Sequence, residues 1–181
     1  MELIISDQHA GLVKAIRTHY QGVTWQRCQT HFMRNILDKT PKALKEELYP
    51  KLRAILDAPD LQTARLLFSK TVETYQDKIP KAMETFENGF DDATAVLMLP
   101  EKYRKRLRTT NAMERLNQEI RRRERVIGIF PIRESLVRLI GALLIEFDKK
   151  WASSRRYFDM AEFESWANDR PNDIKKITRI G

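Results

Sequence analysis

The sequence contains one cysteine, Cys28, among its 181 residues. A single cysteine cannot form a disulfide within the chain and is typical of a reducing compartment, so the sequence predicts a cytoplasmic protein. The amino-terminal residues have only a short apolar run and no basic lead, unlike a secretory signal. No apolar stretch approaches the roughly 20 residues needed to cross a bilayer, so no membrane partner is expected. The longest stretch, residues 136–147, is predicted to be a buried helix.

Motifs for bound nucleotides and for structural zinc are also missing. Neither a P-loop nor a GxGxxG pattern occurs, so nothing supports a nucleotide cofactor. Cys28 and His31 have the C-x2-H spacing that can begin a zinc site, but a closed site needs four ligands and no second Cys/His pair follows. Zinc is therefore not expected, and local packing or hydrogen bonding is favoured for these two residues. A Cys28 nucleophile assisted by His31 lacks any visible oxyanion-hole motif.

Positive charge is abundant and concentrated. The chain has 33 Lys and Arg against 25 Asp and Glu, a net charge of +8, and residues 102–125 alone contain ten basic and three acidic side chains. Such a segment favours binding to a phosphate backbone, because each neutralised phosphate releases counterions. The alternative is a solvated helix face crossed by salt bridges.

The order of the expected elements indicates a chain that is mostly α with a small β part. Residues 3–5 predict a buried strand that ends at Asp7, an amphipathic helix follows up to Gly22, and residues 23–28 predict a second strand. Helices are then expected over residues 31–39, 41–57 (bent or interrupted at Pro50), 60–76, 79–89, 91–98, 111–126, 131–151 and 159–168. Because two strands do not make a stable sheet, either another chain completes it or the gene has lost its beginning.

Two carboxylates attract interest, Asp7 and Glu114. Asn111 could cap the helix, which would make Asn111-x-x-Glu114 a capping box; Met113, Leu116 and Ile120 share one face of this helix and are expected in the core. Alternatively, Glu114 could be a metal ligand. Two carboxylates from different elements can jointly hold Mg²⁺, but a separation of 107 residues does not show that they meet.

Four segments together resemble the mutator-type transposases of bacterial insertion sequences, from Glu2 to about Trp166. These segments read ISDQHAGL, WQRCQTHFMRN, LRTTNAMERLNQEIRRRERVIGIFP and LIGALLIEFDKKW. The resemblance implies a ribonuclease H-like core with an Asp-Asp-Glu triad and two divalent metal ions, Mg²⁺ or Mn²⁺. In this sequence Asp7 matches the second aspartate, Glu114 the glutamate, and Cys28 with His31 the C-x2-H signature of the family.

The resemblance also implies a domain plan and DNA contacts. Residues 1–30 would be part of an incomplete ribonuclease H-like α/β core, 31–106 an all-α insertion, 107–168 the core helices with the glutamate, and 169–181 a tail. Insertion-sequence ends and target DNA would be held by arginines near Glu114: Arg108, Arg115, Arg121, Arg122, Arg123 and Arg125.

No acid in this sequence matches the first aspartate of the triad. The sequence therefore leads us to expect an amino-terminally truncated transposase, inactive alone, from a truncated gene or a broken element. A homo-oligomer or an intact transposase could be its partner. The alternative function is a non-enzymatic basic helical DNA-binding protein, and a weaker one is a metal-dependent nuclease working on two carboxylates.

Overall fold

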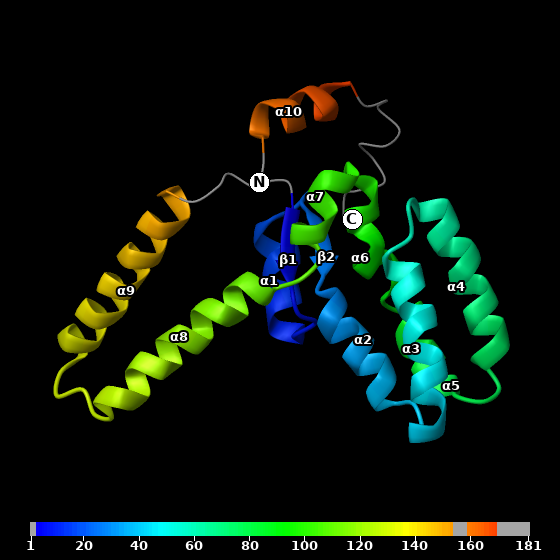
Figure 1. Ribbon diagram of the computed structural model, residues 1–181, viewed down its shortest axis with the longest axis horizontal. Coiled ribbons are helices and arrows are strands. Elements are labelled where there is room, and N and C mark those ends of the chain that lie inside the picture. The colour runs from blue at the N-terminus through cyan, green and yellow to red at the C-terminus, as the bar shows by residue number, and fades with distance from the viewer. Residues whose placement is uncertain (1–2, 154–158, 170–181) are drawn as a thin grey trace. The chain divides into compact units, whose positions relative to one another are not determined.

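The computed structural model describes residues 3–153 and 159–169, and within them the chain divides into two units, with the boundary between residues 110 and 111. The first unit contains β1 (Leu3–Ser6), α1 (Ala10–His19), β2 (Thr24–Arg27), α2 (Gln29–Asp38), α3 (Lys42–Leu56), α4 (Leu61–Tyr75), α5 (Pro80–Glu87), α6 (Phe90–Thr94), the 3-10 helix η1 (Ala95–Met98) and α7 (Glu101–Leu107). The second contains α8 (Asn111–Ile127), α9 (Arg133–Ser153) and α10 (Met160–Asn168) (Figure 1). The predicted class, mostly α with a small β part, is confirmed. Apart from Asp169, the predicted tail lies outside the described residues.

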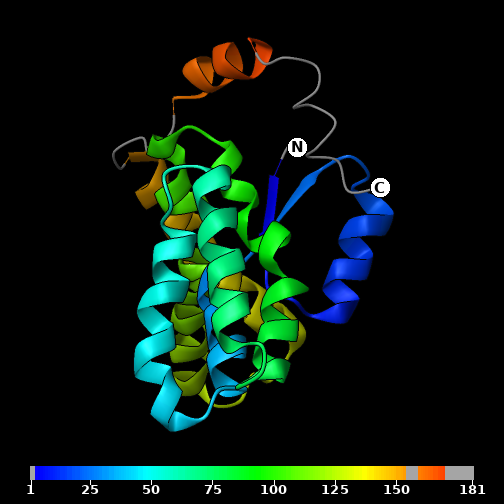
Figure 2. The same ribbon diagram turned by 90° about the vertical axis from the view of Figure 1, so that its right-hand side faces the viewer.

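The two strands are parallel and in register from Leu3 opposite Thr24 to Ser6 opposite Arg27. The helix between them ends before Gly22, whose φ of +81° is strained for side-chain-bearing residues and lets the chain turn back into β2. Figure 2 shows α1 and helices α3 to α5 on opposite sides of the strands. The opening is thus the β-α-β unit that the sequence predicts, and it brings both carboxyl ends to one edge.

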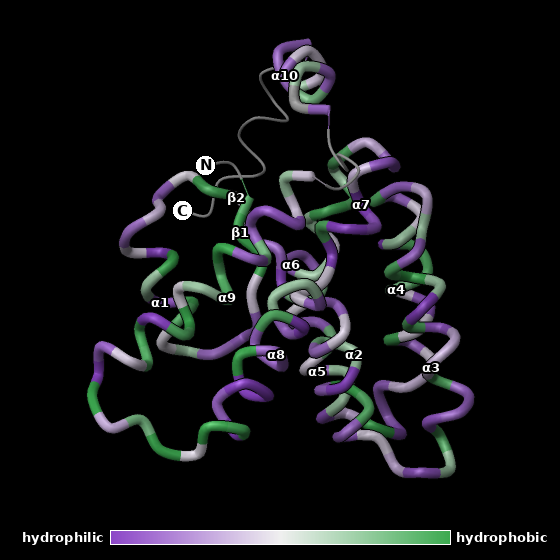
Figure 3. Tube along the Cα trace, turned by 60° about the vertical axis from the view of Figure 1, so that its left-hand side comes forward, coloured by the Kyte–Doolittle hydropathy of each residue, from purple (hydrophilic) through white to green (hydrophobic). Residues whose placement is uncertain are grey.

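A hydrophobic core runs from α2 through η1. Figure 3 shows polar and apolar residues alternating along α3 and α4, as expected for amphipathic helices with one buried face. Three phenylalanine rings pack together in this core, those of Phe68, Phe86 and Phe90. The ring centroids are 4.2 Å apart for Phe68 and Phe90 and 4.7 Å apart for Phe68 and Phe86. Helix α3 continues through Pro50, where an interruption was one expectation, because Leu48 and Leu52 on either side are buried in this core.

Buried polar side chains join the second strand to the helical core. Gln26 is fully buried; its Nε2 donates to the carbonyl oxygen of Ala93 at 2.8 Å, and its Oε1 accepts from the amide of Val96 at 2.7 Å. Gln29 Nε2 donates to the same Ala93 oxygen at 2.9 Å. Satisfied in this way, a buried amide avoids the cost of an unpaired polar group. The strand end is therefore fixed against α6 and η1.

In the second unit, Gly128 has a φ of +73° in the segment that joins α8 to α9. Leu116 is buried as predicted, but Met113 is 54% exposed, which corrects its assignment to the core. Residues 136–147 are helical within α9, yet Val137 and Ile145 are exposed, so the predicted burial is wrong for them. The described part of this unit contains only three helices, too few to cover every apolar face. No helix among the described residues has the length and hydropathy to cross a bilayer.

Gly89 should be intolerant of a side chain. Its φ of −127° is ordinary, but an added Cβ would lie 2.3 Å from Nη1 of Arg27 and 2.5 Å from the Phe32 ring. The Arg27 guanidinium already packs 4.5 Å over the Phe32 ring, inside the core. We expect Gly89→Ala to destabilise the protein by about 1–3 kcal/mol through overpacking, measured by urea unfolding.

The control is Gly141→Ala in α9, where an added Cβ meets nothing within 4 Å. Alanine there should stabilise the helix by about 0.5–1 kcal/mol, because glycine loses more backbone entropy on folding. Equal effects of the two substitutions would contradict the packing at Gly89.

Candidate functional site

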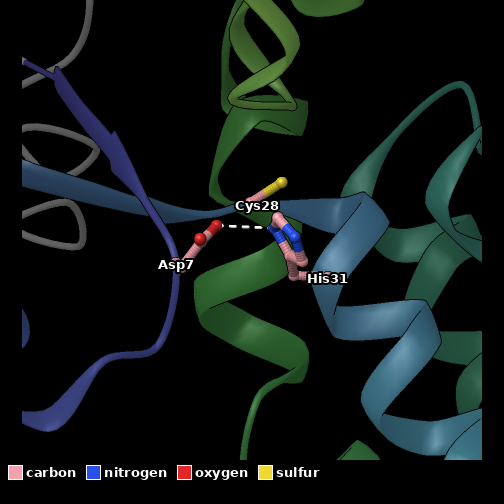
Figure 4. Close-up of side chains that lie close together, drawn as sticks. All are labelled: Asp7, Cys28 and His31. Carbon is pink, nitrogen blue, oxygen red and sulfur yellow. Dashed lines mark ion pairs between the residues drawn. The ribbon is translucent and has the colours of Figure 1, made fainter. Parts of the chain in front are cut away.

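Asp7, Cys28 and His31 form a cluster at the carboxyl edge of the two strands (Figure 4). One ligand-type atom from each side chain lies within 4.8 Å of the other two. Asp7 directly follows β1, Cys28 directly follows β2, and His31 is in the first turn of α2. The parallel register explains their meeting, because the amide of Cys28 donates to the carbonyl oxygen of Ser6 at 2.9 Å and continues the ladder.

Asp7 and His31 are in direct contact. Oδ1 of Asp7 and Nδ1 of His31 are 2.6 Å apart, and the side chains are 49% and 27% exposed. Both atoms are shielded from solvent, although the contact lacks the alignment of a linear hydrogen bond. One oxygen of the Asp7 carboxylate therefore lies against the histidine, while the side chain as a whole remains accessible to solvent.

The backbone beside Asp7 is held by a buried serine. Ser6 Oγ donates to the carbonyl oxygen of Asp7 at 3.0 Å and accepts from the indole Nε1 of Trp25 at 2.9 Å. Neither Ser6 nor Trp25 was predicted from the sequence to belong to the site. The sequence does show that Ser6 is a polar residue at the end of an otherwise apolar strand. Only the strand register shows that the Trp25 side chain reaches Ser6.

The segment that precedes α8 lies against the β2–α2 junction. Thr110 Oγ1 donates to the buried Sγ of Cys28 at 3.3 Å, and the amide of Gln29 donates to the carbonyl oxygen of Arg108 at 3.0 Å. The Arg108 guanidinium forms an ion pair with Asp57, at the end of α3. Of the predicted DNA-binding residues, Arg108 therefore has a partner within its own unit.

The other predicted DNA-binding residues lie on α8. Arg122 Nη2 is 2.9 Å from Oε2 of Glu119, one turn earlier, and Arg123 is 3.8 Å from Glu146 of α9. The remaining three are exposed on the helix: Arg115, Arg121 and Arg125. The helix thus presents guanidinium groups to solvent at several positions along its length.

Glu114 is half-buried in the first turn of α8, in the second unit. The residue expected to cap the helix, Asn111, is its first helical residue, so Thr110 occupies the preceding position. The structure thus brings together Asp7, Cys28 and His31, while Glu114 is described within its own unit.

Asp7 is suited to hold a hard divalent cation. Mg²⁺ and Mn²⁺ prefer oxygen ligands and retain water molecules, and a half-exposed carboxylate at the end of a rigid strand leaves room for both. The carboxylate oxygen beside His31 is shielded from solvent and contacts the imidazole at 2.6 Å.

These features define a mostly helical protein with a β-α-β opening, a carboxylate at the sheet edge and an arginine-rich helix. The chain belongs to the Mutator family of transposases, whose sequence model matches residues 1–154. It is similar to the transposase of insertion sequence IS256 in transposon Tn4001 of Staphylococcus aureus, with 42% identity over 161 residues, covering 87% of this chain and 41% of that protein.

Two further relatives agree with this assignment. The transposase of ISRM5 from Rhizobium meliloti is 38% identical, with 88% of this chain and 40% of the relative covered. The transposase of IS1081 from Mycobacterium tuberculosis is 37% identical, with 87% and 38% covered. The chain thus spans about two-fifths of the length of these relatives.

The Asp57 ion pairs should make stability depend on pH in the acid range. Burial opposes ionisation of Asp57, but the hydrogen bond from Arg53 and the charge of Arg108 hold its pKa below the ordinary value of 3.8. A carboxyl whose pKa falls on folding stabilises the protein above its unfolded pKa and loses that contribution as pH falls through the folded pKa. Asp57→Asn should therefore lower stability at pH 7 by up to about 1 kcal/mol.

The difference between wild type and Asp57→Asn should shrink as the pH falls below the ordinary pKa of 3.8 and through the lower pKa of the folded carboxyl. Urea unfolding at pH 7 and pH 3 measures this change. A difference in stability that is the same at both pH values would contradict the role of the charged carboxylate.

Proposed function

We propose that this chain serves in the transposition of an insertion sequence, by metal-dependent DNA cleavage and strand transfer in a ribonuclease H-like core. Membership of the Mutator family supports this function. The observation that carries the proposal is the placement of Asp7 at the carboxyl edge of parallel strands, next to the segment that leads into the Glu114 helix. Asp7 and Glu114 would bind Mg²⁺ or Mn²⁺.

The length of the chain permits the two carboxylates to meet. Thr110 contacts Cys28 in the Asp7 cluster, and only four residues separate Thr110 from Glu114. Four residues span at most about 14 Å even when extended. Helix α8 begins at Asn111, so Glu114 stands one turn beyond the anchored segment.

Each group has a distinct role in the proposed reaction. Asp7 and Glu114 would hold the metal ions, which would supply activation of the attacking oxygen and stabilisation of the leaving oxygen at phosphorus. His31 would orient the carboxylate of Asp7. The guanidinium groups of α8 hold the DNA backbone without reading its sequence. The DNA bound would be insertion-sequence ends and target DNA.

Iron-directed cleavage tests whether Asp7 and Glu114 bind a common metal site. Fe²⁺ replaces Mg²⁺ at carboxylate sites, and with ascorbate and peroxide it produces hydroxyl radicals that cut the nearby backbone. We expect fragments ending near residue 7 and near residue 114 of the full chain, both suppressed by excess Mg²⁺ and strongly reduced by Asp7→Asn or Glu114→Gln. Mass spectrometry of the fragments locates both cuts.

The matched control is Glu124→Gln, which removes an exposed acid from the same helix and should leave both cuts unchanged. Cleavage near residue 7 alone, with Glu114→Gln behaving like Glu124→Gln, would refute a shared metal site. It would favour the alternative function, a non-enzymatic DNA-binding protein, which the concentration of arginine on α8 supports independently.

Removing exposed arginines from α8 should weaken DNA binding by an electrostatic mechanism. We expect Arg121→Ala/Arg125→Ala to reduce the slope of log K against log salt concentration by up to about 1.8 for duplex DNA, because each lost phosphate contact contributes about 0.9. Fluorescence anisotropy over a series of salt concentrations measures the slope. The double variant Lys42→Ala/Lys70→Ala removes the same charge from exposed positions of α3 and α4. An equal reduction in this control would show that net charge, and not α8, governs binding.

A further inference from the structure

The two residues of the C-x2-H turn contact different segments of the chain. His31 contacts Asp7, which follows β1, at 2.6 Å. Cys28 accepts a hydrogen bond from Thr110, which immediately precedes α8, at 3.3 Å. The turn itself is rigid, because Cys28 is fully buried and its amide is bonded to Ser6 of the neighbouring strand. It therefore contacts both Asp7, after β1, and Thr110, the residue before α8.

The geometry favours direct contacts over a zinc ion shared by these side chains. Two ligands of one tetrahedral zinc ion lie more than about 3 Å apart, because each bond to zinc is about 2.0–2.3 Å long. The observed 2.6 Å between Nδ1 of His31 and Oδ1 of Asp7 is shorter than that separation. The third possible zinc ligand, Sγ of Cys28, already accepts a hydrogen bond from the hydroxyl of Thr110.

The segment of residues 108–110 is held at three points. The carbonyl oxygen of Arg108 accepts from the amide of Gln29 at 3.0 Å, and its guanidinium pairs with Asp57 of the helical core. The third point is the Thr110 to Cys28 hydrogen bond. A backbone contact, a side-chain ion pair and a buried thiol thus hold residues 108–110 within the first unit.

We infer that the Cys28–His31 turn is a positioning device that aligns the two carboxylate-bearing segments. His31 orients the Asp7 carboxylate, and Cys28 together with the amide of Gln29 anchors the start of the helix that carries Glu114. In this proposal Cys28, His31 and Thr110 act as positioning residues. The inference rests on the proposed function for the role of Glu114, but the anchoring itself can be measured without any metal.

Hydrogen exchange measures the anchoring directly. Thr110→Val removes the hydroxyl donor and keeps the shape of the side chain, so we expect the amide of Gln29, which donates to Arg108 of the same segment, to exchange about three- to tenfold faster. Thr109→Val makes the same chemical change one residue earlier and should leave exchange unchanged. Cys28→Ala should act like Thr110→Val, while Cys28→Ser, which keeps an acceptor atom, should restore most of the protection.

Iron-directed cleavage then tests whether the anchoring matters for metal binding. Thr110→Val should weaken both cuts several-fold, because the shared site needs both carboxylates in place, whereas Thr109→Val should leave both cuts unchanged. His31→Ala should weaken both cuts, since the orientation of Asp7 governs metal binding.

Two results would overturn the inference. The first is unchanged exchange at the amide of Gln29 in both Thr110→Val and Cys28→Ala. The second is stoichiometric binding of Co²⁺ with a sulfur-to-cobalt charge-transfer band that disappears in Cys28→Ser, which would assign the turn to a metal site instead. If wild-type protein gave no iron cleavage, the proposed function would fail, and hydrogen exchange would still decide whether the anchor exists.

Discussion

The parallel pairing of β1 with β2 is the constraint on which the site depends. Strand register places Ser6 opposite Arg27, so that the residues directly after each strand, Asp7 and Cys28, lie side by side. A shift of one residue would turn every side chain of β1 to the other face and separate Asp7 from His31. The hydrogen bond from the Trp25 indole to Ser6 joins side chains of the two strands and stabilises the same register.

The strands form a small sheet, and their stability comes from the helical core beside them. Gln26 and Gln29 join the end of β2 to α6 and η1 through hydrogen bonds that are all buried. Such bonds are directional, and leaving one of their groups unpaired in the interior would be costly. They therefore specify one arrangement of the strand edge on the core, where apolar packing alone would tolerate several.

The spacing of apolar residues along the sequence predicted much of the fold, and the elements that it predicted wrongly have physical explanations. The helices with one apolar face were found within a few residues of their observed bounds, because burial on one side produces a 3.6-residue period. Helix α7 was missed because Tyr103 is its only buried residue and charged side chains hide the period. The interruption considered at Pro50 did not occur, since core packing on both sides of a proline can outweigh one lost backbone hydrogen bond.

The sequence by itself determined the family, the helical composition, the concentration of positive charge in residues 102–125 and the candidate residues Asp7, Cys28, His31 and Glu114. These properties depend on residue types and short spacings, which local chemistry controls. Only the tertiary structure decided that Asp7 contacts His31, that Cys28 contacts Thr110 and that Arg108 pairs with Asp57. Such contacts join residues 24 to 82 positions apart, and strand register together with helix packing, which no local pattern encodes, brings them together.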